Sequence, residues 1–206
     1  MSNRLTQQLD IDYPIIQAPM AGVSTPELAA AVSGAGALGS LGLGSATIEQ
    51  AETLINRTRR LTTRPFNVNL FCHAPAVRDP QREARWLARL RPEFARFGSL
   101  PPETLAEIYL SFQQQPRMAE LLLDLTPAAV SFHFGVPDRE TLRQLREKGI
   151  VTLASATSVA EALLAVEQGI DMVVAQGYEA GGHRGIFDPL APDGQMSTFT
   201  LVQTIR

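Results

Sequence analysis

The 206-residue sequence predicts an α/β fold of the (β/α)₈ TIM-barrel type, with about six of the eight βα units present. Short apolar runs alternate with stretches of helical periodicity, which is typical of a parallel sheet covered by helices. The first expected strand leads into QAPMAG and not into a GxGxxG fingerprint, which argues against a doubly wound sheet. Polar residues instead end several expected strands, as in a barrel whose site is built from its loops: Gln17, Asn69, His133, Ser155 and Gln176.

The first half of the chain contains clear local start and stop signals. Thr25, Pro26 and Glu27 begin a helix, because a hydroxyl cap precedes a proline at the first helical position and an acid in the first turn. Gly34 ends that helix. Residues 48–61 form the next helix, with apolar side chains on one face. We expect strands at residues 13–20, 37–44 and 65–71.

Residues 72–115 break this alternation, and we expect them to form a helical insertion after the third strand. Two polar stretches in the insertion have helical character, REARWLARLRPEF (82–94) and PETLAEIYLSFQ (102–113). The regular helix of the unit follows at residues 116–125. Connections after barrel strands carry function more often than the strands do. The insertion is therefore a candidate cover for a ligand.

The alternation returns after the insertion and continues to the last residue. We expect strands at 128–134, 150–156 and 171–177, and helices at 137–149 and 158–169. The sixth strand leads into a polar, glycine-rich loop, QGYEAGGHRG (176–185). Another helix then opens within residues 198–206.

The predicted barrel is longer than the sequence. A (β/α)₈ barrel takes ~250 residues, and six strands are used by residue 177. We therefore interpret residues 1–206 as one partial barrel domain that lacks its last βα units. We expect these residues to be the amino-terminal part of a longer chain, or a partner or second copy to supply the rest, because a six-stranded open barrel exposes its edges.

Composition limits the class of protein. The net charge is −3 and no basic block occurs, so neither nucleic acid nor an anionic membrane is an expected partner. No apolar run reaches the ~20 residues of a membrane helix. Cys72 is the single cysteine, which excludes an internal disulfide and fits a reducing cytoplasm.

Five stretches in order give the sequence a family resemblance: YPIIQAPMAG, FNVNLF, VSFHFG, ASATSVAEA and QGYEAGGHRG. The chain resembles, over its whole length, the nitronate monooxygenases (formerly 2-nitropropane dioxygenases), which are FMN-dependent barrels, and is most similar to the bacterial class I enzymes. The resemblance implies oxidation of alkyl nitronates such as propionate 3-nitronate, or of nitroalkanes, by O₂. The products are a carbonyl compound and nitrite or nitrate, and no nicotinamide cofactor is needed.

Two other functions stay open. NAD(P)H-dependent flavin reductases of the same barrel type, acting on quinones or enoyl thioesters, share parts of the pattern. The enoyl reductases tend to carry QGGM where this chain has QAPM, and the SFHFG stretch favours the monooxygenase. A truncated barrel without catalytic activity is the second alternative.

The resemblance implies which residues hold the cofactor. An amide in an apolar strand needs a partner when buried, and glycines allow backbone N–H groups to approach an anion. The family carries the FMN phosphate on loops after strands seven and eight, which these residues do not reach. The expected cofactor-binding residues are Ala18, Pro19, Met20, Asn69, Ser155, Gln176, Gly181 and Gly182.

Three further residues are expected to act on the substrate. His133 can serve as a base, because an imidazole with a pKa near ~6.5 can take a carbon-bound proton from a nitroalkane. The resemblance places His183 and Tyr109 against the substrate, where a phenol can donate to a nitro oxygen. His73, His133 and His183 come from three different loops without HxxxH spacing, so no metal site is expected.

Overall fold

The computed structural model describes residues 3–206, and its centre is a parallel sheet whose strands lie side by side in chain order. Each neighbouring pair of strands is parallel. A doubly wound sheet reverses its strand order at a switch point, and this order contains no reversal, so the sheet is an arc of a barrel. The strands are β1 (Gly39–Gly42), β2 (Phe66–Phe71), β3 (Ala129–His133), β4 (Val151–Ala156) and β5 (Met172–Ala175).

The helices begin where their capping residues predict. Side chains of Thr25, Thr47, Asp138, Ser158 and Ser197 each accept a hydrogen bond from a main-chain N–H of the first helical turn. The helices are α1 (Arg4–Leu9), α2 (Pro26–Gly34), α3 (Ile48–Leu61), α4 (Pro80–Arg96), α5 (Pro116–Leu125), α6 (Arg139–Glu147), α7 (Val159–Gln168) and α8 (Thr198–Thr204), with a short 3₁₀ helix η1 (Phe112–Gln114).

The two faces of the sheet have different chemistry. Alternate strand residues pack with side chains of α3, α5 and α6 in the main apolar cluster; among them are Leu41, Val68, Leu70, Val130 and Phe132. The opposite face carries buried polar residues in the middle strands, namely Ser40, Asn67, Asn69 and Ser131. Below them, Leu9 and Ile11 pack against Leu38, Ala129 and Leu153, so the amino-terminal end of this face is closed by apolar residues. The opposite, carboxyl end is left for a site.

Residues 13–20 do not form the strand that the sequence predicts, so that prediction is wrong. Residues 13–20 make one isolated parallel bridge, between Ile16 and Leu38. Pro14 and Pro19 bring no N–H to a ladder. The side chain of Gln17 replaces the next ladder pair, because its Oε1 accepts from the N–H of Ser40 (3.2 Å) and its Nε2 donates to the carbonyl of Ser40 (3.2 Å). The segment still lies beside β1 but is held by a side chain.

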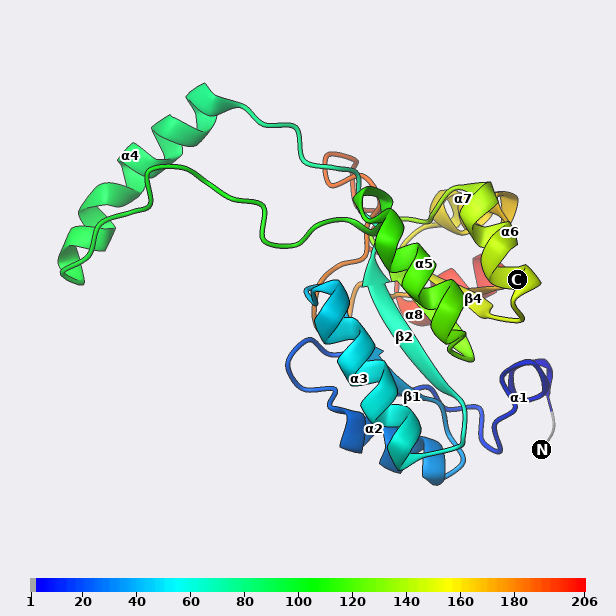
Figure 1. Cartoon of the computed structure of the whole chain (residues 1–206). Helices are drawn as coiled ribbons and strands as arrows, with labels where there is room; N and C mark the ends of the chain where they lie inside the picture. The colour runs from blue at the N-terminus through cyan, green and yellow to red at the C-terminus, as the bar shows by residue number, and fades with distance from the viewer. Residues whose placement is uncertain (1–2) are drawn as a thin grey trace.

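Only one of the two helices expected in the insertion is present. Its first helix exists as α4, which stands away from the rest of the chain (Figure 1). The second expected helix, at residues 102–113, is wrong: the chain returns without regular structure until η1. Short helices depend on packing an apolar face, and here Ile108 stays 74% exposed. Tyr109 therefore lies on an irregular segment that returns from α4 to the sheet, and not on a helix.

No helix within residues 3–206 combines the length and the apolar character needed to cross a membrane.

Candidate functional site

His133 is the last residue of β3, where the strand leaves the buried sheet. Its neighbour Phe132 is fully buried, so alternation places the imidazole on the polar face. Nε2 of His133 lies 3.2 Å from the main-chain oxygen of His183. A carbonyl oxygen only accepts, so Nε2 is the donor in this contact. Burial lowers the pKa of His133, and the imidazole is therefore neutral near pH 7.

Gln176 follows β5 and connects to the same loop. Its Nε2 donates to the carbonyl of His183 (2.9 Å), and its Oε1 accepts from the N–H of Gly185 (2.6 Å). The side chains of the predicted residues His133 and Gln176, at the ends of β3 and β5, thus both contact the main-chain oxygen of His183. The side chain of His183 itself is exposed.

Gly185, which the sequence analysis did not select, is required by packing. A Cβ at this position would lie 2.6 Å from Cε1 of His133, so no larger residue fits beside the imidazole. Gly182 has φ +78°, a left-handed conformation that favours glycine. At Gly181 a Cβ would have no atom within 4 Å, so packing within residues 3–206 does not require glycine there. The sequence signal that could have identified Gly185 is its place as the third glycine of GGHRG.

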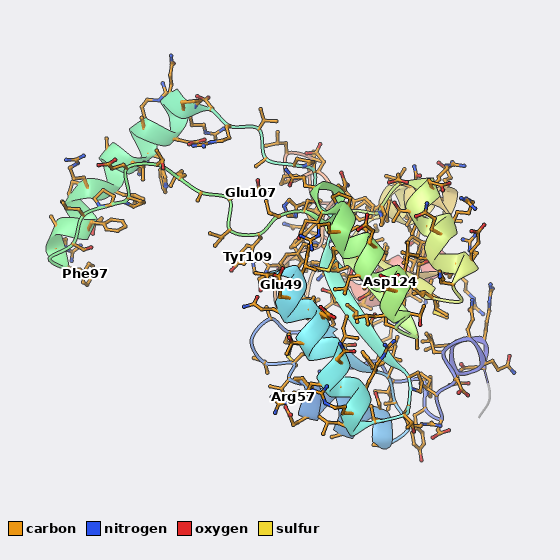
Figure 2. The ribbon with its side chains drawn as sticks, in the orientation of Figure 1. Glu49, Arg57, Phe97, Glu107, Tyr109 and Asp124 are labelled. Atoms are coloured by element: carbon orange, nitrogen blue, oxygen red, sulfur yellow. The ribbon has the colours of Figure 1, made fainter. Side chains whose placement is uncertain are left out.

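An aromatic cluster lies on one side of the imidazole and contacts it through Phe134. Phe134 has φ +70°, unusual for a bulky residue, and its ring lies 4.3 Å from that of His133 and 5.1 Å from that of Phe71, centroid to centroid. The ring of His183 lies 6.1 Å from Phe134, and Tyr109 meets Phe71 edge-on at 6.1 Å. Tyr109, on the irregular segment that returns from α4 (Figure 2), thus meets this cluster through Phe71. The sequence analysis did not identify Phe71 or Phe134 as part of the site.

Asn69 lies deeper on the polar face. Its Nδ2 donates to Oγ of Ser131 (2.9 Å), and Nδ2 of Asn67 donates to the same oxygen (2.9 Å). Oδ1 of Asn67 is buried without a hydrogen-bond partner in the described residues. Buried polar atoms are nearly always paired, so this oxygen is an exception among residues 3–206.

The first loop borders the site from the side of β1. A Cβ on Gly42 would lie 3.1 Å from the main-chain carbon of Met20, so this loop passes directly over the end of β1. Ala18 and Met20 are exposed, and Pro19 is half-buried. Ser155 is half-buried near the end of β4. Among residues 3–206, none of these four forms a hydrogen bond, ion pair or ring contact with His133 or Gln176, so the structure brings the predicted site together only in part.

Arg184 fixes the loop that follows β5. Its guanidinium binds Asp193 through Nε–Oδ2 (2.8 Å) and Nη2–Oδ1 (2.9 Å) and donates to the carbonyl of Gln176 (2.6 Å). The hydrogen bonds from Arg184 lower the pKa of Asp193 to about 2. Within residues 3–206, no group of three or more His, Cys, Asp or Glu side chains is arranged to hold a metal ion.

Comparison with known proteins places this arrangement in a family. The family model "Nitronate monooxygenase" matches residues 2–206. A nitronate monooxygenase of Pseudomonas aeruginosa is 53% identical over 205 residues, which are 100% of this chain and 58% of the relative. One from Paraburkholderia phytofirmans is 52% identical over 197 residues, which are 96% of this chain and 54% of the relative. The chain thus spans little more than half the length of these relatives.

Solved structures agree on the fold. A nitroalkane oxidase from Streptomyces ansochromogenes superposes with a TM-score of 0.85 at 38% identity, over 99% of this chain and 57% of that one. FabK from Thermotoga maritima superposes with a TM-score of 0.70 at 26% identity, over 100% and 50%. The barrel fold predicted from the sequence is confirmed by the nitroalkane oxidase.

Flavin dependence is general in the matching family. Since the family model covers all but one residue of the sequence, the chain belongs to the nitronate monooxygenase family.

Proposed function

We propose that this chain takes part in the FMN-dependent oxidation of alkyl nitronates, such as propionate 3-nitronate, by O₂ to carbonyl products and nitrite or nitrate. The observation that carries the proposal is the neutral imidazole of His133, held at a strand end against the loop of His183. A small anionic or weakly acidic substrate suits such a site, because a neutral imidazole can take a proton from carbon near pH 7.

The residues present fit a flavin. The main chain at Gly181 is open to a ligand, and Ala18 and Met20 are exposed in the loop over the end of β1. A bound FMN would supply the electron transfer between nitronate and O₂. We propose that it is held by Ala18, Pro19, Met20, Asn69, Ser155, Gln176, Gly181 and Gly182.

The protein groups would bind and orient the substrate. His183 is exposed at the loop, and Tyr109 reaches the same aromatic cluster from the insertion. Donors from these two side chains would bind nitro or nitronate oxygens. His133 would lie next to the reacting carbon and take its proton when the substrate is a neutral nitroalkane.

We further propose that residues 1–206 form one partial barrel domain, with residues 72–115 as its insertion, and that they act in the cytoplasm. The buried Cys72 fits a reducing compartment. The partners are then small molecules, a nitronate or nitroalkane and O₂. A second copy of the chain is the macromolecular partner to look for, by a size measurement in solution.

An absorption spectrum tests the proposal. The purified chain is mixed with FMN without oxygen, and propionate 3-nitronate or NADH is added. We expect bleaching of the flavin by the nitronate alone, followed by recovery of colour when oxygen is admitted. Bleaching by NADH alone would assign the chain to the flavin reductases, and a chain that binds no FMN in excess cofactor would be non-catalytic.

A further inference from the structure

The carbonyl of His183 receives two side-chain donors at once. Nε2 of His133 lies at 3.2 Å and Nε2 of Gln176 at 2.9 Å. A carbonyl oxygen has two lone pairs, so both are used. This single oxygen links the end of β3 to the residue that follows β5.

Gln176 also holds the chain on the far side of that carbonyl. Its Oε1 accepts from the N–H of Gly185 (2.6 Å), two residues after His183, and its own carbonyl accepts from Nη1 of Arg184 (2.6 Å). Gln176 thus donates one hydrogen bond and accepts two, one with each of residues 183, 184 and 185. Gln176 therefore holds the segment on which the His183 oxygen lies.

The oxygen decides which nitrogen of His133 is basic. Because a carbonyl cannot donate, the proton of the neutral ring stays on Nε2, and the lone pair is on Nδ1. No hydrogen bond to Nδ1 is formed by any residue between 3 and 206. Gly185 leaves the space that the ring occupies, since a Cβ there would lie 2.6 Å from Cε1 and 3.0 Å from Nδ1.

We propose that Gln176 is a positioning residue that, through the His183 carbonyl, fixes the tautomer of His133 and makes Nδ1 its base atom. The catalytic consequence rests on the proposed function. With a neutral nitroalkane, the C–H bond next to the nitro group breaks, its electron pair enters the nitro group to give the nitronate, and the proton binds Nδ1 to give the imidazolium.

Nitrogen NMR tests the tautomer without any assay of activity. The sequence has three histidines, His73, His133 and His183, so a chain labelled with ¹⁵N-histidine gives three ring systems. The set missing from His133→Asn belongs to His133. We expect the wild-type ring above pH 7 to be neutral with the proton on Nε2. A proton on Nδ1 in the wild type would overturn the proposal.

Substitution then tests the role of Gln176. We expect Gln176→Leu to give a mixture of tautomers at His133, because the carbonyl is no longer held. Gln17→Leu is the matched control: Gln17 also binds main chain at a strand end, but at Ser40, and its loss should leave the His133 tautomer unchanged. An unchanged tautomer in Gln176→Leu would overturn the proposal. If that variant does not fold, Gln176→Glu keeps the acceptor for Gly185 and removes the donor, and the same two outcomes decide.

Kinetics give an independent result. With FMN added, Gln176→Leu should lower kcat for a neutral nitroalkane by about 10²-fold, at the low end of what a misplaced base costs. Turnover of the preformed nitronate should fall less. A wild-type chain that turns over neither substrate would reject the proposed function but leave the NMR result valid, so the two failures can be told apart.

Discussion

Arg184 and Asp193 form a two-point ion pair across the loop after β5, with Nε–Oδ2 at 2.8 Å and Nη2–Oδ1 at 2.9 Å. Parallel hydrogen bonds of this kind are the strongest geometry available to an arginine and a carboxylate. The same guanidinium donates to the carbonyls of Gln176 and Thr157. One side chain therefore ties the loop to the ends of β4 and β5.

The loop should loosen in acid. The pKa of Asp193 is lowered from 3.8 to about 2 by its hydrogen bonds to Arg184 and to the N–H of Gln195. A lowered pKa in the folded state means that the pair stabilises the loop fully above the unfolded pKa and is lost as the pH falls from about 4 to about 2. Hydrogen exchange of the Gly185 amide, corrected for its intrinsic rate, should show protection falling in this range.

Asp193→Asn is the comparison for that measurement. The introduced side-chain amide cannot titrate. Protection of the Gly185 amide should therefore be lower at neutral pH and should show no separate decrease between pH 4 and 2. A wild-type-like acid transition in this variant would show that another group controls the loop.

Gly185→Ala should destabilise the chain and shift the imidazole. The new Cβ would lie 2.6 Å from Cε1 of His133, closer than van der Waals contact allows. Overpacking of this kind costs about 1–3 kcal/mol. Gly34→Ala is the matched control, because a Cβ there has no atom within 4 Å and alanine favours the end of α2. Urea unfolding of both variants should separate them, and equal stabilities would refute the close packing.

Stability should also depend on His133 in mild acid. Burial lowers the pKa of this histidine in the folded chain, so the unfolded chain binds the proton first as the pH falls. The neutral ring therefore contributes stability above its unfolded pKa of ~6.5, which is lost on acidification. The urea midpoint of the wild type should fall between pH 7.5 and 5.5 more than that of His133→Gln. Parallel curves would show that His133 does not titrate differently on folding.

His133→Asn should distinguish two kinds of substrate. A neutral nitroalkane needs a proton removed, whereas a preformed nitronate does not. Losing a positioned base typically costs 10²-fold to about 10⁴-fold, so we expect that loss in kcat/KM with nitroalkane and a much smaller one with propionate 3-nitronate. Equal losses on both substrates would assign His133 to binding and not to proton removal.

Cys72 should be inert in the folded chain. Its thiol is 1% exposed, and burial raises its pKa to about 12, so almost no thiolate forms at pH 8. Titration with a thiol reagent at pH 8 should find no reactive sulfur until urea is added, and then one per chain. Rapid reaction in buffer would mean that the segment around η1, where Gln113 covers Cys72, opens often.

Local sequence signals were sufficient for the helices that pack on the sheet. Helix α3 occupies residues 48–61 as expected, because its cap Thr47 and its apolar face agree. The segments at 13–20 and 102–113 failed for different reasons. Pairing of the first depends on the side chain of Gln17 reaching Ser40, which no local pattern reveals. The second has helical composition but nothing to pack against.

The sequence analysis selected polar residues that come together at the candidate site, but not the residues that pack against them. His133 and Gln176 stood out because polar groups at strand ends are unusual, and the structure joins them at the His183 oxygen. Gly185 and Phe134 were missed, since Gly185 packs against the ring of His133 and the ring of Phe134 lies near that of His183, and each pair is about fifty residues apart in the chain. Sequence periodicity describes neighbours along one element and carries no information on such contacts.

The projecting helix α4 offers a place at which the chain can be divided into two fragments. Phe97, 83% exposed, marks its far end, well away from the sheet (Figure 2). A protease cut there would leave β1 and β2 in one fragment and β3, β4 and β5 in the other. The two fragments would still share the β2–β3 ladder and the bonds from Ser111 and Gln113 to the carbonyls of His73 and Cys72. Co-expressed as two polypeptides divided beside Phe97, they should reassemble into one particle.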